Sequence, residues 1–213
     1  MKFRFFLLFI LIPIFTKAQG YSYYDHLIPG SDIYSIFDYQ FNYYSNVRTV
    51  LFKGLSDKPE IRLLVIPSFT PENVLDIQKD EENDNYYLIY HICERRIWSN
   101  KNKEEIKVKE YKAEIDSASV QLIKSLFLKA IKQTKYPENE IDGRDGITYH
   151  FFAWDHGLKT GTVWSPQTPK MRQLVEIGNE LINLAKKSDG SIISFNKNLI
   201  EDIEKLNKEL EQS

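Results

Sequence analysis

The feature that most constrains the fold is the change to a two-residue hydrophobic period after Glu60. Alternating apolar and polar residues are typical of β-strands, because successive side chains point to opposite faces of a sheet. Proline-containing turns and an acidic run, Asp80 to Asn85, separate four such segments. These segments are IRLLVI (Ile61–Ile66), VLDIQKD (Val74–Asp80), YYLIYHICERRIW (Tyr86–Trp98) and EEIKVKEYKAEI (Glu104–Ile115). They predict an antiparallel meander of four strands.

The last of these segments changes register along its length. Its apolar residues Ile106 and Val108 have even numbers, whereas those from Tyr111 onwards have odd ones. In a strand that buries a single face, both groups face the core only if one extra residue lies between them. We therefore expect a one-residue bulge near Lys109 or Glu110.

A second pair of strands is predicted in DGITYHFFAWDHGLKTGTVWSP (Asp145–Pro166). Bulky residues occupy both faces of the segment from Ile147 to Trp154, as expected for a strand covered on each side. Asp155-His156-Gly157 has the composition of a turn, and Leu158 to Trp164 returns as the partner strand. Cross-strand aromatic pairs stabilise hairpins of this kind.

Four further segments show the three- and four-residue spacing of helices that pack on a core. Their predicted starts are Ser31 or Asp32, Asp116 or Ser117, Thr168-Pro169, and Lys197. Gly178 lies in the apolar stripe of the third helix, where glycine costs about 1 kcal/mol relative to alanine. We expect this glycine to allow close contact between helix and sheet.

Together these elements predict a single α+β domain of residues 19–213. Its antiparallel sheet has about six strands, four from the meander and two from the C-terminal hairpin, and helices cover it mainly on one side. The C-terminal helix, residues 199–211, is expected to pack on this body. The open face of the sheet and its edges are then the expected places for a partner.

The first 18 residues are typical of a secretory signal peptide. Lys2 and Arg4 precede an apolar run from Phe5 to Phe15, and Thr16-Lys17-Ala18 places small residues at a cleavage site before Gln19. The apolar run is shorter than the ~20 residues that span a bilayer. The sequence therefore predicts an exported protein, periplasmic or extracellular, of a Gram-negative bacterium.

Charge and cysteine content exclude several classes of function. Cleavage of the signal leaves 25 basic against 30 acidic residues, so the mature chain is mildly acidic and nucleic acid is not an expected partner. No second long apolar segment follows, and no membrane span is expected after signal cleavage. The single cysteine, Cys93, has no internal disulfide partner, and glycine-rich phosphate loops are absent from the sequence. We expect no cofactor and no metal.

The Asp145–Pro166 hairpin contains the first candidate catalytic residues. His150 is a candidate base, with Asp155 or His156 to orient it. A strand residue and turn residues five or six positions later do not automatically meet, and no serine or cysteine in the segment is placed as a nucleophile. The alternative is that these residues belong to a structural hairpin.

His91 and Cys93 form the second candidate pair. They are two residues apart in one predicted strand and therefore share a face. With His150 nearby they would form a zinc site, and by themselves a cysteine–histidine pair. A buried thiol and a hydrogen-bonded structural histidine explain the same residues without chemistry.

Several longer segments support a resemblance to known proteins. They are RLLVIPSFTPENVLDI, YYLIYHIC, LFLKAIKQTKYPE, DGITYHFFAWDHGLKTGTVWSP and MRQLVEIGNELINLAK. Over Leu51 to Lys187 the chain resembles a family of small exported bacterial proteins with no assigned function. The resemblance implies a periplasmic or extracellular setting and supplies no catalytic residues.

Two functional hypotheses follow from the sequence. In the first, the chain is an exported, non-enzymatic binding or accessory protein that recognises another protein or a component of the cell envelope. In the alternative, it is a small periplasmic hydrolase that uses His150 with Asp155 or His156, or a His91–Cys93 pair. The first hypothesis rests on the absence of a complete catalytic motif from a sequence that is otherwise well patterned for packing.

Overall fold

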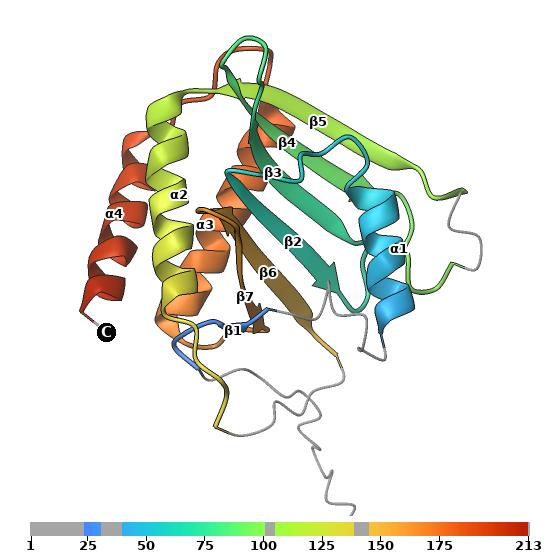
Figure 1. The fold of residues 1–213 in the computed structure, drawn as a ribbon, viewed down its shortest axis with the longest axis horizontal. Helices are drawn as coiled ribbons and strands as arrows, with labels where there is room; N and C mark the ends of the chain where they lie inside the picture. The colour runs from blue at the N-terminus through green and yellow to red at the C-terminus, as the bar shows by residue number, and fades with distance from the viewer. Residues whose placement is uncertain (1–23, 31–39, 101–104, 139–144, 213) are drawn as a thin grey trace, which may run out of the picture.

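Two-residue periodicity produces an antiparallel sheet in which seven strands are hydrogen-bonded in the order β1-β7-β6-β2-β3-β4-β5 (Figure 1). The strands are β1 (Ile28–Pro29), β2 (Ile61–Pro67), β3 (Asn73–Lys79), β4 (Tyr86–Cys93), β5 (Val108–Ile115), β6 (Ile147–Trp154) and β7 (Leu158–Trp164). The helices are α1 (Phe41–Leu51), α2 (Ser117–Lys132), α3 (Pro169–Lys187) and α4 (Lys197–Glu211). The mixed α+β class predicted from the sequence is confirmed.

The computed structural model describes residues 24–30, 40–100, 105–138 and 145–212. The expected signal peptide and the expected helix start at Ser31 or Asp32 lie outside these residues. The first helix is described from Phe41 to Leu51.

The predicted meander and hairpin are both present. Strands β2 to β5 pair in sequence order, and β6 of the hairpin pairs with β2, so the two predicted units form one continuous sheet. The strand beyond the predicted six is β1, which pairs Ile28 with Thr162 and Pro29 with Gly161. A two-residue strand is too short to produce a hydrophobic period, which is why the sequence did not reveal it.

The predicted bulge in the fourth meander strand is wrong. The β4–β5 pairing is continuous from Tyr86 opposite Ile115 to Cys93 opposite Val108. Its premise, a strand with one buried face, does not hold, because Val108 packs on one side of the sheet and Ile115 on the other. A strand covered on both faces needs no extra residue.

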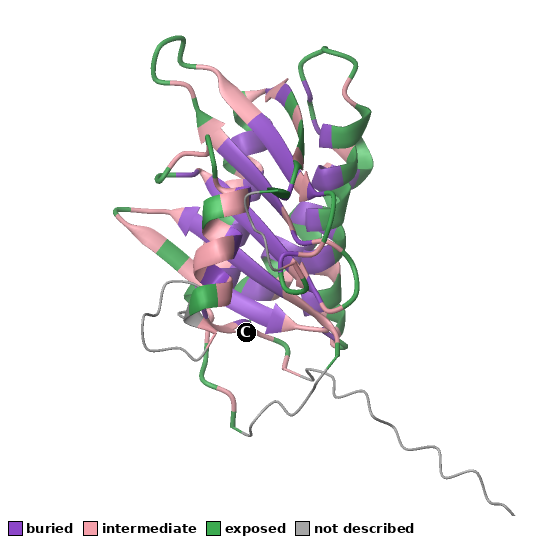
Figure 2. Ribbon diagram, turned by 90° about the vertical axis from the view of Figure 1, so that its right-hand side faces the viewer, coloured by how far each residue is buried: buried purple, intermediate pink, exposed green. Residues whose placement is uncertain are grey.

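Three helices cover one face of the sheet, and α1 covers part of the other. The larger core lies between the sheet and α2, α3 and α4, and includes Leu63, Leu75 and Phe151. The smaller core lies under α1 and includes Val47, Leu64 and Phe152. Figure 2 shows buried positions running along the strands between these layers. The second face is therefore not open as expected; we call it the α1 face.

Helix boundaries follow local capping. The Asp116 carboxylate accepts from Ser119 N–H at 2.9 Å at the start of α2, and Asn196 accepts from Leu199 N–H at 2.9 Å at the start of α4. The apolar stripe of α4 is buried against α2 and α3. Among the helices of the described residues, none combines the length and the apolar character that a membrane crossing requires.

Gly178 is the point of closest approach between α3 and the sheet. A Cβ atom at this position would lie 2.5 Å from Cδ2 of Leu63, which is fully buried in β2. Such a contact forces the leucine side chain to move within a packed core. The close approach expected from the sequence is thus present.

We expect Gly178→Ala to lower the free energy of unfolding by about 1 kcal/mol, because overpacking costs more than alanine adds in helix propensity. In a Leu63→Val background, which lacks the crowding Cδ atoms, the same substitution should stabilise the protein. Denaturant unfolding of the four proteins in the cycle measures both effects. An equal effect of Gly178→Ala in the two backgrounds would contradict this contact as the reason for glycine.

Candidate functional site

Two charged side chains are buried together on the α1 face. Arg62 of β2 and Asp76 of β3 are direct cross-strand neighbours, and Arg62 Nε donates to Asp76 Oδ2 at 2.5 Å. Burial raises the pKa of Asp76 to about 6, against the lowering effect of the Arg62 guanidinium. The carboxylate is therefore mostly ionised at neutral pH and paired with its cation. Removing one partner of such a pair leaves a buried charge and is strongly destabilising.

Arg62 also holds the chain that follows α1. Its Nη2 donates to the Ser56 carbonyl at 2.6 Å, and its guanidinium carbon lies 4.3 Å from the centre of the Phe52 ring. Ser56 N–H in turn donates to the Gln78 side-chain oxygen at 2.8 Å. Polar residues of β2 and β3 thus fix the end of α1 to the sheet.

His91 of β4 connects α1 to the edge strand β5. Its Nδ1 lies 2.8 Å from the Leu51 carbonyl oxygen, and its Nε2 lies 3.0 Å from Glu110 Oε2. Both neighbouring oxygens are acceptors, so the doubly protonated imidazolium is the form that donates both hydrogen bonds.

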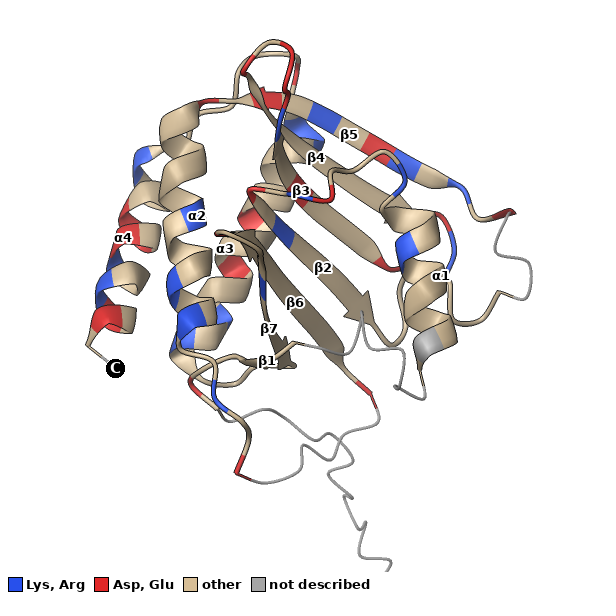
Figure 3. Ribbon diagram, in the orientation of Figure 1, with Lys and Arg blue, Asp and Glu red and all other residues tan. Residues whose placement is uncertain are grey.

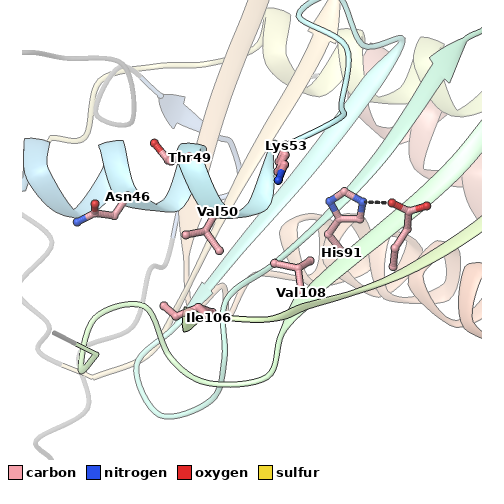
Figure 4. A pocket seen from close by; sticks show the side chains of 8 residues that line it. Asn46, Thr49, Val50, Lys53, His91, Ile106 and Val108 are labelled. Atoms are coloured by element: carbon pink, nitrogen blue, oxygen red, sulfur yellow. Dashed lines mark hydrogen bonds and ion pairs between the residues drawn. The ribbon is translucent and has the colours of Figure 1, made fainter. Parts of the chain in front are cut away.

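A groove of about 670 Å³ lies between α1 and β5, beside this histidine. We call it the α1–β5 groove. Figure 4 shows Asn46, Thr49 and Lys53 on the helix side and Ile106 and Val108 on the opposite side. Val50, His91 and Glu110 complete its lining. The groove therefore has an apolar middle and one charged end, the mixture typical of sites that hold a ligand in a defined orientation.

Glu72 anchors the loop between β4 and β5 to α1. Its carboxylate is buried and accepts hydrogen bonds from Tyr43 OH at 2.8 Å, Ile97 N–H at 2.7 Å and Trp98 N–H at 3.2 Å. The Trp98 ring, which is exposed, packs edge-on against Tyr43. Burial and the neighbouring Glu72 raise the pKa of Tyr43 well above its usual range, so its hydroxyl remains a donor.

His150 lies in β6, buried under the α1 residue Tyr44 rather than in the groove. Its ring meets Tyr44 edge-on, with centroids 5.9 Å apart, and stacks on Phe152 at 6.4 Å. Its Nε2 has no hydrogen-bond partner among the described residues. Burial lowers its pKa to about 4, so the imidazole is neutral at physiological pH.

The other hairpin candidates lie away from His150. Asp155 and His156 are in the β6–β7 turn, five and six residues after His150. At 3.3 Å per residue these positions are about 16 Å and about 20 Å from the histidine. His156 Nε2 lies 3.9 Å from Asp155 Oδ1, and the histidine side chain is fully exposed. The structure brings Asp155 and His156 together but not with His150.

His91 and Cys93 share the α1 face of β4, as their spacing predicts. Cys93 is buried, and burial raises its pKa to about 12, so the thiol is protonated at neutral pH. His150 and His91 are in register across β6, β2, β3 and β4, which places them about 14 Å apart at 4.8 Å per strand. In the described part of the chain, no three histidine, cysteine, aspartate or glutamate side chains are grouped as a metal site requires.

Sequence reasoning missed the polar residues that surround the groove. Arg62 and Asp76 each interrupt an apolar strand, and charged residues in two successive meander strands were the available signal for a cross-strand pair. Glu110 and Lys53 gave no such signal, because exposed strands and helix ends commonly carry charges. Only the three-dimensional arrangement places them beside His91.

Comparison of the chain with protein-family models, with curated proteins and with solved structures finds no match.

The buried neutral His150 makes stability depend on pH. Its unfolded pKa of about 6.5 falls to about 4 in the folded protein, so its stabilising contribution is complete above pH 6.5 and is lost as the pH falls towards 4. The difference corresponds to about 3 kcal/mol. We expect His150→Phe to reduce the loss of unfolding free energy between pH 6.5 and 4 by this amount, measured by urea unfolding at each pH. The exposed His156→Gln is the matched control, and equal pH slopes in wild type and His150→Phe would refute the assignment.

We expect the Cys93 thiol to resist alkylation in the native protein. At pH 8 the raised pKa leaves about a thousandfold less thiolate than in the unfolded chain. Iodoacetamide labelling followed by mass spectrometry, with and without guanidinium chloride, measures the difference. Native labelling as fast as denatured labelling would show instead that the thiol is accessible and reactive.

Proposed function

We propose that the chain is an exported, non-enzymatic binding or accessory protein of the bacterial cell envelope, and that it binds another protein through the α1–β5 groove. The observation that carries this proposal is the composition of the groove. Apolar side chains line its middle, and Lys53, His91 and Glu110 meet at one end. Both ring nitrogens of His91 are engaged, Nδ1 with the Leu51 carbonyl of α1 and Nε2 with Glu110 of β5, which suits a structural role.

The geometry of the candidate residues also favours binding over hydrolysis. A hydrolase of the kind considered above needs both a nucleophile and an orienting side chain within about 3 Å of its base. His150 is about 16 Å from Asp155 and about 20 Å from His156 at 3.3 Å per residue. Cys93 shares a strand face with His91, but its thiol is buried and protonated. The periplasmic hydrolase is therefore the weaker alternative.

Export is part of the same proposal. Its support is the charged and apolar order of residues 1–18 and the resemblance of Leu51–Lys187 to small exported proteins. The mass of the protein recovered from the periplasm or the medium tests it, because cleavage after Ala18 leaves a chain that starts at Gln19.

Site-specific photocrosslinking in living cells tests the binding site. With a benzophenone amino acid in place of Thr49, which is exposed at the groove, we expect one discrete adduct with another envelope protein. The same substitution at the exposed Glu204 on α4 is the control and should give no such adduct. Adducts of equal yield at both positions, or none at Thr49, would contradict binding at the groove.

A further inference from the structure

The outer edge of β5 has a defined hydrogen-bonding pattern. Glu94 N–H donates to the Lys107 carbonyl at 2.9 Å, so the odd-numbered residues of β5 direct their backbone groups towards β4. The even-numbered residues direct theirs outward. Two bonds at the other end agree with this alternation: Ile193 N–H donates to the Glu114 carbonyl at 2.8 Å, and Asp116 N–H donates to the Ile193 carbonyl at 3.0 Å.

Ile193 pairs with only the C-terminal end of this edge. The outward N–H and C=O groups of Val108, Glu110 and Lys112 have no hydrogen bond to any other described residue. Figure 1 shows β5 at the margin of the sheet with no further strand beside it. An edge of this length is a template for another strand.

The α1–β5 groove lies directly against this unpaired edge. Ile106, Val108 and Glu110 form one wall of the groove, and α1 forms the other (Figure 4). Alternate side chains of a strand added to β5 would point into the groove, because side chains alternate across a sheet. Backbone pairing and side-chain recognition would then occur at one place, as in other proteins that bind peptides by strand addition.

The charges at the groove indicate the chemistry of such a segment. Lys112 follows Glu110 on the same face of β5 and, with Lys53, adds positive charge near the end of the groove where Glu110 is hydrogen-bonded to His91. Figure 3 shows the alternating charges along β5. At the opposite end, Val108 lies beside the apolar side chains of Val50 and Ile106. An apolar residue opposite Val108 and an acidic residue opposite Lys112 are four positions apart on an extended strand.

We propose that β5 binds an extended segment of a protein partner by strand addition along Val108–Lys112, and that this segment carries an apolar and an acidic residue four positions apart. The inference rests on the proposed protein-binding function and names its mode and the chemistry of the partner. Two other outcomes are possible: the segment belongs to a second copy of this chain, or the partner binds through the exposed Trp98 and Phe69 side chains. The experiment below distinguishes both from strand addition by a partner.

Selection of linear 12-residue peptides displayed on phage against the mature protein supplies the probes. The selected peptides should carry the apolar and acidic residues at the stated spacing. Bound peptide should slow amide hydrogen exchange of Val108, Glu110 and Lys112 by about tenfold or more. Exchange of Lys109 and Tyr111, whose N–H groups already face β4, should not change.

Backbone substitutions provide the matched controls. N-methylation of the peptide residues whose N–H groups face β5 should abolish binding, whereas N-methylation of the alternate residues should leave it intact. On the protein, Glu110→Pro removes an outward N–H, which edge strands tolerate, and should abolish binding. Glu110→Ala removes the same side chain but keeps the N–H, so the proline variant should bind peptide at least tenfold more weakly than the alanine variant.

Three results would overturn strand addition. The first is that no selected peptide slows exchange of the alternate β5 amides. The second is that a peptide slows exchange at Phe69 and Trp98 instead of β5. The third is that sedimentation shows a concentration-dependent dimer in which the same β5 amides exchange slowly without peptide. The second result leaves protein binding itself intact. Failure of the groove crosslink at Thr49 would instead reject the proposed function.

Discussion

The described structure depends on hydrogen-bonded pairs of polar side chains. These side chains are buried because the sheet is covered on both faces. Arg62 and Asp76 neutralise each other between β2 and β3, and His91 is hydrogen-bonded to a helix carbonyl and a strand carboxylate. Each group is costly to bury without its partner. Because Arg62 also binds the Ser56 carbonyl after α1, and His91 binds the Leu51 carbonyl of α1, these hydrogen bonds fix the position of the helix over the sheet.

This arrangement explains why α1 contributes a groove instead of a second full layer. The helix is tied to the sheet at its C-terminal end by His91 and Arg62, and near its start by the Tyr43–Glu72 hydrogen bond. The residues between these anchors pack on β2, β3 and β6 through Val47 and Tyr44. The side of α1 that faces β5 is left to line the groove with Asn46, Thr49 and Val50.

Periodicity was sufficient to predict the meander, the late hairpin and the helices from Asp116 onwards, because these elements bury apolar residues at regular spacing. It failed where a buried position is polar or a pairing is very short. The alternation of Asp76 with the apolar residues Leu75 and Ile77 predicts that the aspartate points to solvent, but it is fully buried. The two-residue β1 and the absence of a bulge in β5 depend on tertiary contacts that no local pattern contains.

The edge strand shows how one set of charges serves two requirements. Lys109, Glu110 and Lys112 oppose uncontrolled strand pairing, since any added strand must place a compatible residue opposite each of them. The same requirement makes the edge selective, because a segment that matches the charges gains backbone hydrogen bonds that a mismatched one cannot form without burying an unpaired charge. His91 reinforces this selectivity by engaging Glu110 from within the sheet. An edge protected in this way therefore favours a specific partner strand over general aggregation.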